Sequence, residues 1–586
     1  MKWLILSLLA LPACSSSDGG DDEETVIQSD VESIRVEPAS ITLSTDGTTA
    51  GKVKFKAYAT TDSGEEVETD MVSWSVSNLS AGEINTRGKF ESSTLNGGVT
   101  TVTATHVGIE GTAVVTVVYE QDVLEGELPS SLVDAFDSAT PTDSDLPAIA
   151  YPEDGVTVPR NLEGLAFTWD KPEAANITRL RMQSGITDMS IYTEGDTWYS
   201  SSDVWATIAA SNTEGTVDVS VESGVWDGST LSDVRRGPFF TLTVNRLDAR
   251  GSVLYWVARS ETDDGGQPGG DIMRIPFGST EAEAFWTFED AGQCVGCHTL
   301  VEAGEKMVVT HQGVNGNFSI IDVSDPDLPE TWLGTEETRR ATFHAASPDG
   351  EFLLTVADGK AGLYSLFTGS FIMEVDTGGA QVSHPDWSPA GDSVLLVRVT
   401  STSMNDMNFE GGEIIRMSWN GNSFGTPEVL VPATADRNNY YPAFSPDGEW
   451  IAYNRSSRTE ITRADGTVEV SSTSYANPSA ELWLMAKDGT FQTRLDIANG
   501  EGELQNSFPR WGPLPDDDVL WLAFSSVRPY PVEPNFERYL RWLPQIWVTA
   551  IEPEKILDGE DPSAAPFWLP AQDSQSDNHL AIWWSK

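Results

Sequence analysis

The sequence has few cysteines, few histidines and few basic residues. It contains 3 Cys and 6 His in 586 residues, and 35 Lys and Arg side chains against 90 Asp and Glu, for a net charge of −55. This charge disfavours nucleic acid and anionic lipid surfaces as partners, because both attract basic proteins. The 20 Trp, 22 Phe and 13 Tyr residues exclude a chain that is disordered throughout. The length predicts three or four folded domains.

Long hydrophobic runs are also missing, apart from one at the start of the chain. Lys2 precedes an apolar run at residues 3–11, which is too short to span a bilayer. The run ends in Leu11-Pro12-Ala13-Cys14, which resembles a bacterial lipobox. The resemblance implies that residues 1–13 are a signal peptide and that Cys14 carries a lipid anchor to the membrane. Because Ser15 follows in place of Asp, analogy with lipoproteins of diderm bacteria favours the outer membrane. The alternative is an ordinary secretory signal with a chance cysteine.

The rest of the chain predicts an all-β fold with two β-sandwich domains and a β-propeller. The expected boundaries are an acidic tether at 14–32, a first sandwich at 33–120, a Ser-, Asp- and Pro-rich linker at 121–146, a second sandwich at 147–246 and the propeller at 247–586. Both sandwiches are predicted from short strands separated by turn residues. The first resembles a group 2 bacterial immunoglobulin-like domain, with Trp74 in the place of that family's core Trp, which implies a spacer. The second is loosely similar to a fibronectin domain.

The propeller is predicted from an internal repeat. Four segments, CHTLVEAG, HAASPDG, PDWSPAG and PAFSPDG, align on Gly304, Gly350, Gly391 and Gly448, and a degenerate fifth copy begins at Pro509. Each is followed by two apolar strands, and repeats of about 40–65 residues with three or four strands are typical of propeller blades. The repeat resembles that of TolB-type propellers. One more blade before the first repeat makes roughly six, and the terminal strand HLAIWWS is expected to close the ring.

The motif that carries chemistry is Cys294-Val295-Gly296-Cys297-His298. C-x-x-C-H predicts covalent attachment of one haem c, in which two thiols bond to the two vinyl groups and the imidazole is the proximal iron ligand. An export signal supports this interpretation, because haem is attached to such proteins outside the cytoplasm. Two alternatives stay open: a disulfide between the two cysteines and, less favoured, a zinc half-site, for which no second cysteine pair exists.

Candidates for a sixth iron ligand come from the same alignment. His298 shares its place in the repeat with His344, Pro385 and Pro442, which places the haem where inner strands of neighbouring blades converge. The first candidate for the distal ligand is His384, one residue before the aligned position, and the second is His344. His579 on the closing strand is weaker, as are Met307 and His311. If none of them binds, the iron keeps an open position.

The whole arrangement resembles a family of lipoproteins from myxobacteria and their relatives. In that family a sandwich with a YPEDG-like opening precedes a haem motif built into a TolB-like propeller. The resemblance covers roughly residues 147–586 and includes SHPDWSPAG around His384 and DNHLAIWW around His579. It implies an architecture more than an activity.

Three functions are therefore weighed. The first is a lipid-anchored c-type cytochrome-like protein of the cell envelope that transfers single electrons or senses redox state, with a redox or envelope protein as partner; the acidic surface would suit a basic one. The second is a binding or adhesion module for proteins or peptides, with Cys294 and Cys297 in a disulfide. The third is an enzyme with five-coordinate haem, which is least favoured because no distal acid–base set can be named.

Overall fold

The computed structural model describes residues 31–259, 269–301, 305–401, 405–462, 466–513, 519–530 and 543–585. The expected signal peptide, Cys14 and nearly all of the expected tether lie outside these residues. No helix in the described part of the chain is both long and apolar enough to cross a membrane. The described residues divide into two compact units, the first made of residues 31–43, Ala50–Ser93 and Val99–Val117, and the second of the other described residues.

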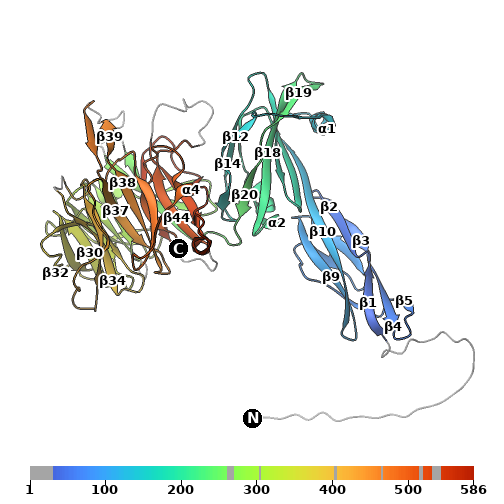
Figure 1. The fold of residues 1–586 in the computed structure, drawn as a ribbon, viewed down its shortest axis with the longest axis horizontal. Coiled ribbons are helices and arrows are strands. Elements are labelled where there is room, and N and C mark those ends of the chain that lie inside the picture. The colour runs from blue at the N-terminus through green and yellow to red at the C-terminus, as the bar shows by residue number, and fades with distance from the viewer. Residues whose placement is uncertain are drawn as a thin grey trace, which may run out of the picture. The chain divides into compact units, whose positions relative to one another are not determined.

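The first unit is a sandwich of short strands (Figure 1). They are β1 (Val31–Glu37), β2 (Ser40–Thr45), β3 (Lys52–Lys54), β4 (Lys56–Thr61), β5 (Glu66–Thr69), β6 (Ser73–Val76), β7 (Gly82–Ile84), β8 (Lys89–Ser92), β9 (Gly98–His106) and β10 (Ile109–Leu124), of which β10 runs on into the second unit. Alternate side chains of β9 and β10 are buried around Phe55 and Phe90. Trp74, which was expected in the core, is only partly buried at the edge of the core. Its ring centroid lies 6.4 Å from that of Phe55.

The second unit begins with another sandwich. Its strands are β11 (Thr142–Asp143), β12 (Ala148–Tyr151), β13 (Val156–Val158), β14 (Ala166–Asp170), β15 (Ile177–Gln183), β16 (Thr187–Thr193), β17 (Thr197–Tyr199), β18 (Gly215–Trp226), β19 (Leu231–Arg236) and β20 (Phe240–Val244). One sheet has the order β12-β14-β17, and the other is built around β19-β18-β15-β16. Helix α2 (Ser202–Ser211), which was not expected, buries Trp205 and Ile208 against this core.

The segment expected to be a linker is ordered. Residues 121–146 contain the end of β10, helix α1 (Ser131–Ser138) and β11. Leu132 and Phe136 lie one helical turn apart and are both buried, in a cluster with Ile177 and Tyr192. The polar composition of the segment concealed this single apolar stripe, which is enough to dock a two-turn helix.

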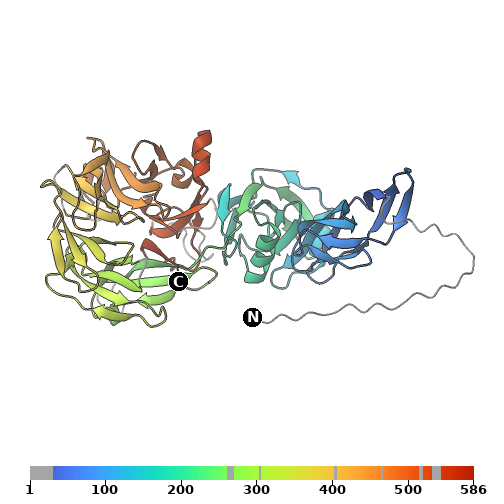
Figure 2. The same cartoon turned by 90° about the horizontal axis from the view of Figure 1, so that it is seen from below.

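The six-bladed propeller is confirmed. Figure 2 shows its blades following one another around a ring. Blade 1 contains β21 (Ser252–Arg259), β22 (Gly269–Pro276), β23 (Glu283–Trp286) and β47 (Asn578–Trp584); blade 2, β24 (Val295–Leu300), β25 (Lys306–His311), β26 (Gly316–Asp322) and β27 (Glu330–Leu333); blade 3, β29 (Phe343–Ala346), β30 (Phe352–Ala357), β31 (Lys360–Ser365) and β32 (Phe371–Glu374). Blade 4 contains β33 (Gln381–Trp387), β34 (Ser393–Val399), β35 (Gly412–Ser418) and β36 (Glu428–Val431); blade 5, β37 (Arg437–Phe444), β38 (Trp450–Ser457), β41 (Glu481–Ala486) and β42 (Gln492–Arg494); blade 6, β43 (Ser507–Trp511), β44 (Leu520–Ser526), β45 (Gln545–Ile551) and β46 (Phe567–Trp568).

Shorter elements decorate the ring. They are β28 (Arg340–Ala341), which pairs with β26; the hairpin of β39 (Thr459–Thr462) and β40 (Val468–Ser471) between two strands of blade 5; helices α3 (Phe288–Ala291) and α4 (Asp496–Asn499); and the 3₁₀ helix η1 (Pro553–Asp558).

The C-terminal strand closes the ring, as expected from the sequence. β47 pairs antiparallel with β21, from Ser252 opposite Trp584 to Val257 opposite Asn578, and so becomes the innermost strand of blade 1. The first blade is thereby built from both ends of the propeller segment. The innermost strands around the axis are β47, β24, β29, β33, β37 and β43.

The repeated Ser-Pro-x-Gly segment forms the turn after the inner strands of blades 3, 4 and 5. In blade 5, Ser445 Oγ accepts a hydrogen bond from the backbone N–H of Trp450 at 2.9 Å and so closes the turn. The turn glycines have positive φ angles of 72°, 70° and 71° at Gly350, Gly391 and Gly448, a conformation that favours glycine. These turns also contact one another, since a Cβ atom on Gly391 would lie 3.3 Å from Pro348 Cγ of the preceding blade.

Replacing Gly391 by Ala should therefore destabilise the propeller. The left-handed backbone alone predicts a loss of about 1–2 kcal/mol in the free energy of unfolding, measured by urea denaturation. Gly334→Ala is the matched control, because Gly334 has no atom within 4 Å of a new Cβ and no positive φ. Equal stability of the two variants would contradict this account of the repeat.

Candidate functional site

The C-x-x-C-H motif begins just after a short helix and continues into an inner strand of the propeller. Helix α3 begins with a capping box, in which Thr287 and Asp290 bond each other's backbone N–H groups, and ends at Gly292, whose φ is 66°. Cys294 follows in the connection, and Cys297 and His298 lie on β24. The indole N–H of Trp256 on β21 donates to the carbonyl of Val295 at 2.7 Å, which fixes the motif against blade 1.

A β-bulge on β24 turns Cys297 out of the regular strand alternation. Val295 is opposite His311 and His298 is opposite Val309, so β24 has one extra residue over this stretch. Similar irregularities occur on β33, β37, β43 and β47. Non-glycine residues with positive φ lie at these four bulges: His384 at 44°, Tyr441 at 48°, Phe508 at 57° and Leu580 at 55°. Proline follows the first three, and proline without an N–H is tolerated in a sheet at such bulges.

The side chains at these bulges meet around the axis. The ring centroid of His384 lies 4.5 Å from that of Phe343 and 3.8 Å from that of Tyr441, which in turn lies 4.3 Å from that of Phe508. Cys297 and Leu580 pack against the same cluster. Each inner strand thus gives one side chain to a ring of contacts, which we call the axial ring: Cys297, Phe343, His384, Tyr441, Phe508 and Leu580. All except Leu580, on the closing strand, lie one position before the aligned residue of the repeat.

His298 and His344 occupy equivalent positions, as the alignment predicts. His298 is opposite Val309 and His344 is opposite Thr355, in each case the residue five places after the aligned glycine. Both line one small cavity of about 20 Å³, together with His384, Cys297 and Arg510. Three histidines from three neighbouring blades are therefore brought to one place.

The three histidines of this cavity are buried with unpartnered ring nitrogens. Neither nitrogen of His298 or His344 makes a hydrogen bond of good geometry within the described part of the chain, nor does Nε2 of His384. Burial lowers the pKa of His298 to about 4 and that of His344 to about 3, and it lowers the pKa of His384 well below its ordinary value. All three are neutral imidazoles at pH 7, the form that binds metal.

The two cysteines of the motif are free thiols that line one apolar cavity. It has a volume of about 190 Å³ and is also lined by Trp256, Met407 and His579. Burial raises the pKa of Cys297 to about 12 and also raises the pKa of Cys294. The disulfide that the sequence left open is not formed.

The remaining ligand candidates differ in their surroundings. His579 lies with the two thiols instead of with His298, and its Nδ1 has no partner within the described residues. His311 is satisfied by Ser319 Oγ at 2.9 Å and the carbonyl of Cys294 at 3.3 Å. Met307 is fully buried in an apolar cluster within the blades. His311 and Met307 are thus held by the blades, whereas His344, His384 and His579 each have a ring nitrogen without a partner.

Sequence reasoning missed two residues at this site. Met407, in the connection between β34 and β35, reaches the cavity of the two thiols, and no pattern in that loop indicated it. Arg510 on β43 reaches the cavity of the histidines, although its place just after the aligned Pro509 was a usable signal.

The donor atoms fit a covalently attached haem better than a bare metal ion. In the described part of the chain no group of three or more His, Cys, Asp or Glu side chains is arranged to hold a metal ion. A haem iron needs only one or two protein ligands, because the porphyrin supplies four nitrogens. Free thiols beside an unpartnered imidazole match that need. No single cavity here reaches the volume of about 300–1,000 Å³ usual for ligand pockets, so binding requires side chains of the axial ring to rotate.

Comparisons with known proteins find distant structural likenesses. No family model and no curated protein matches the chain. Among solved structures, a nidogen/laminin complex aligns at 9% identity with a TM-score of 0.36, covering 56% of this chain and 97% of that one. A TolB from Agrobacterium tumefaciens aligns at 15% identity and 0.30, covering 57% and 97%, and the Swd1 β-propeller domain of Myceliophteria thermophila at 13% and 0.25, covering 50% and 90%. With TM-scores below 0.5, the propeller assignment rests on the strand pairing itself.

The buried histidines predict that the protein, with nothing bound to them, loses stability in mild acid. The folded-state pKa of His344 is about 3, against about 6.5 when unfolded, so between these values only the unfolded chain binds the proton and stability rises with pH. His344→Gln should reduce the slope of unfolding free energy against pH by about 1.4 kcal/mol per pH unit between roughly pH 5.5 and 4. Urea titrations at a series of pH values measure this slope. An unchanged slope would mean that His344 takes up its proton in the folded state.

Proposed function

We propose that this protein binds one haem c covalently and transfers single electrons, or senses redox state, in the bacterial cell envelope. The observation that carries the proposal is the pair of free thiols in one apolar cavity, directly before a buried histidine whose ring nitrogens make no hydrogen bond of good geometry within the described residues. Buried polar atoms without partners are rare and call for an explanation such as an absent ligand.

Cys294 and Cys297 would hold the porphyrin. Each thiol adds across one vinyl group, so that a sulfur–carbon bond forms and the thiol hydrogen moves to the other vinyl carbon, with no oxidant required. Their apolar cavity keeps both thiols protonated before attachment. When bound, the haem supplies a one-electron iron couple.

His298 would be the proximal ligand, and His384 the first candidate for the distal one. His384 lines the same cavity as His298 and keeps Nε2 free, while its Nδ1 accepts a long hydrogen bond of 3.4 Å from the backbone N–H of Tyr441. His344 lines that cavity too and is the second candidate. His579 stays the weaker one, since it lines the cavity of the thiols.

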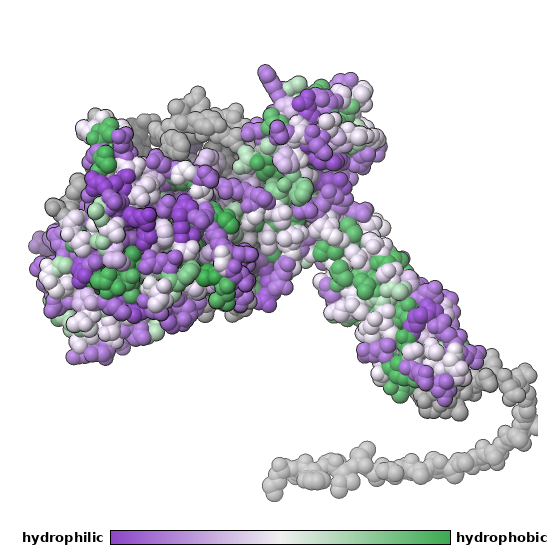
Figure 3. Space-filling model, in the orientation of Figure 1, coloured by the Kyte–Doolittle hydropathy of each residue, from purple (hydrophilic) through white to green (hydrophobic). Residues whose placement is uncertain are grey.

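The envelope location and the partner belong to the same proposal. A lipid on Cys14 would anchor the protein, and Ser15 favours the outer membrane. A single haem cannot carry electrons far, so a redox partner must dock. The net charge of −55 favours a basic partner, and Figure 3 shows a face where hydrophilic side chains predominate and apolar ones form scattered patches.

Absorption spectroscopy tests the proposal. Protein made with the periplasmic haem-attachment machinery should show a sharp c-type α-band in alkaline pyridine, and the haem should stay with the polypeptide after denaturation and acid–acetone extraction. Cys297→Ala should lose most of the covalent haem, because one thioether is removed. His384→Ala should shift the native oxidised spectrum from low-spin toward high-spin iron, while the α-band in pyridine is unchanged.

Met307→Leu is the control for these variants, because Met307 lies on the neighbouring strand but is buried among apolar side chains. A colourless wild-type protein would overturn the haem assignment. If His384→Ala keeps low-spin iron and His344→Ala shows high-spin iron, the distal ligand is His344 instead of His384. High-spin iron already in the wild type would favour the enzyme hypothesis.

A further inference from the structure

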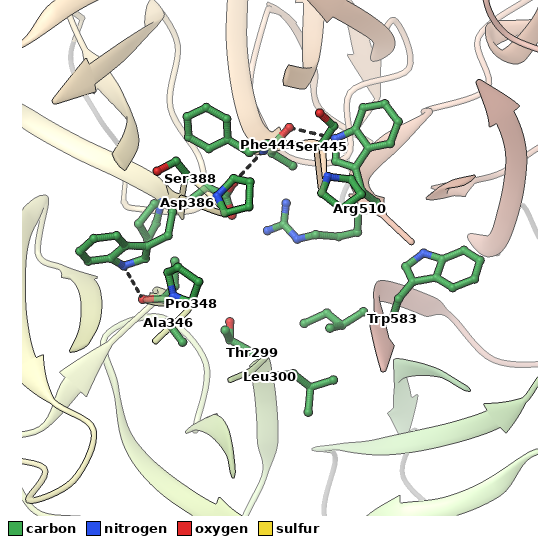
Figure 4. A pocket seen from close by; sticks show the side chains of 18 of the residues that line it. Thr299, Leu300, Ala346, Pro348, Asp386, Ser388, Phe444, Ser445, Arg510 and Trp583 are labelled. Carbon is green, nitrogen blue, oxygen red and sulfur yellow. Dashed lines mark hydrogen bonds between the residues drawn. The ribbon is translucent and has the colours of Figure 1, made fainter. Parts of the chain in front are cut away.

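The cavity on the other side of the histidines from the two thiols contains one arginine near its centre. Figure 4 shows the side chain of Arg510 extending into the space between the inner strands, with Thr299, Asp386 and Ser445 around it. The cavity has a volume of about 200 Å³ and is rimmed by the prolines of the repeated turns. Its polar groups converge from blades 2, 4, 5 and 6.

Arg510 has no ion-pair partner within the described residues. Its Nη1 donates only to the carbonyl of the neighbouring Pro509, at 3.0 Å. The carboxylate of Asp386, which lines the same cavity, accepts a hydrogen bond from the backbone N–H of Phe444 at 2.8 Å. Other propeller arginines do hold carboxylates, for example Arg274 with Glu283, Arg416 with Glu428 and Arg494 with Glu481. A guanidinium that lines a cavity without an ion-pair partner, in a protein with a large excess of carboxylates, is suited to binding an anionic ligand.

Three cavities follow one another along the axis. The cavity of the thiols shares Cys297, Phe343 and Leu580 with the cavity of the histidines. The cavity of the histidines shares Arg510, His344 and Ile582 with the cavity of Arg510, whereas the first and last cavities share no lining residue. The order along the channel is therefore thiols, then histidines, then arginine.

A haem c has its functional groups in the same order. The vinyl groups that form thioethers lie along one edge of the porphyrin, the iron lies at the centre, and two propionate carboxylates leave the opposite edge. Building on the proposed function, we propose that Arg510 binds the propionates of the haem attached at Cys294 and Cys297. The arginine thereby sets which way the porphyrin lies in the channel and raises its reduction potential.

Redox titration of the holoprotein tests this role. Arg510→Gln removes a cation beside the propionates, which favours the ferric state. The midpoint potential should therefore fall by ~59 mV, which corresponds to a tenfold lower equilibrium constant for one-electron reduction. The potential should also become more dependent on pH between about 5 and 7, because the propionates lose the cation that keeps them ionised. Arg510→Lys should restore most of the potential.

The matched control is Arg437→Gln, which removes the same charge from an exposed position on β37 that lines none of the three cavities. Equal shifts in Arg437→Gln and Arg510→Gln, or no shift in either, would overturn the proposal. A structural role alone would not produce the new pH dependence.

A second arm separates propionates from a free carboxylate ligand. The Cys294→Ala/Cys297→Ala protein has no thiols to attach haem, and succinate binding to it can be followed by fluorescence of Trp387, Trp511 and Trp583, which line the cavity. We expect the double variant to bind succinate saturably and the further substitution Arg510→Gln to abolish this binding. The wild-type holoprotein should not bind succinate, because the propionates fill the site. Equal binding to the holoprotein would assign Arg510 to a free carboxylate. A wild type without haem would overturn the proposed function, and failure of succinate to bind the double variant would overturn the carboxylate site itself.

Discussion

The pairing of β47 with β21 is the constraint on which the rest of the site depends. Because the last strand of the propeller completes its first blade, six inner strands are forced to converge on one axis. Their side chains then share a small volume from which water is largely excluded. Any polar group placed there loses its hydration and must find a partner or a ligand. The axial ring, which includes His384, and the neighbouring His298 and His344 are the direct result of this convergence.

The local sequence decides what is placed at the axis. Bulges on five of the six inner strands, three of them before a proline, each turn one side chain toward the centre, and four of them hold a non-glycine residue at positive φ. Such strained conformations persist where the surrounding structure determines them, and they are frequent at functional sites. The bulges at Cys297 and His384 place a thiol and an imidazole in the lining of the cavity. Burial keeps the imidazole neutral, so that its lone pair is available to a metal, and it keeps the thiol protonated.

Much of this architecture could be predicted from sequence, because it depends on repeated local patterns. The aligned glycines identified the turns, the alternation of apolar residues identified the strands, and the alignment placed His298 and His344 at equivalent positions. The contents of the channel could not be predicted in the same way. Met407 reaches the site through the geometry of the closed ring and belongs to no motif, and Arg510 was indicated only by its place after the aligned Pro509. The sequence also did not predict that residues 121–146 are ordered. Their composition is polar, but the burial of two side chains, Leu132 and Phe136, is enough to dock the helix.

The most direct test of the account is mass spectrometry of the peptide that contains the motif. Trypsin cleaves after Arg274 and after Lys306, and the peptide between them holds Cys294, Cys297 and His298 with no other basic cleavage site. Protein from cells that attach haem should yield this peptide with the added mass of one haem, bound through both cysteines. The same peptide with two unmodified thiols, or with a disulfide, would contradict the central claim that this propeller is built around a covalent haem.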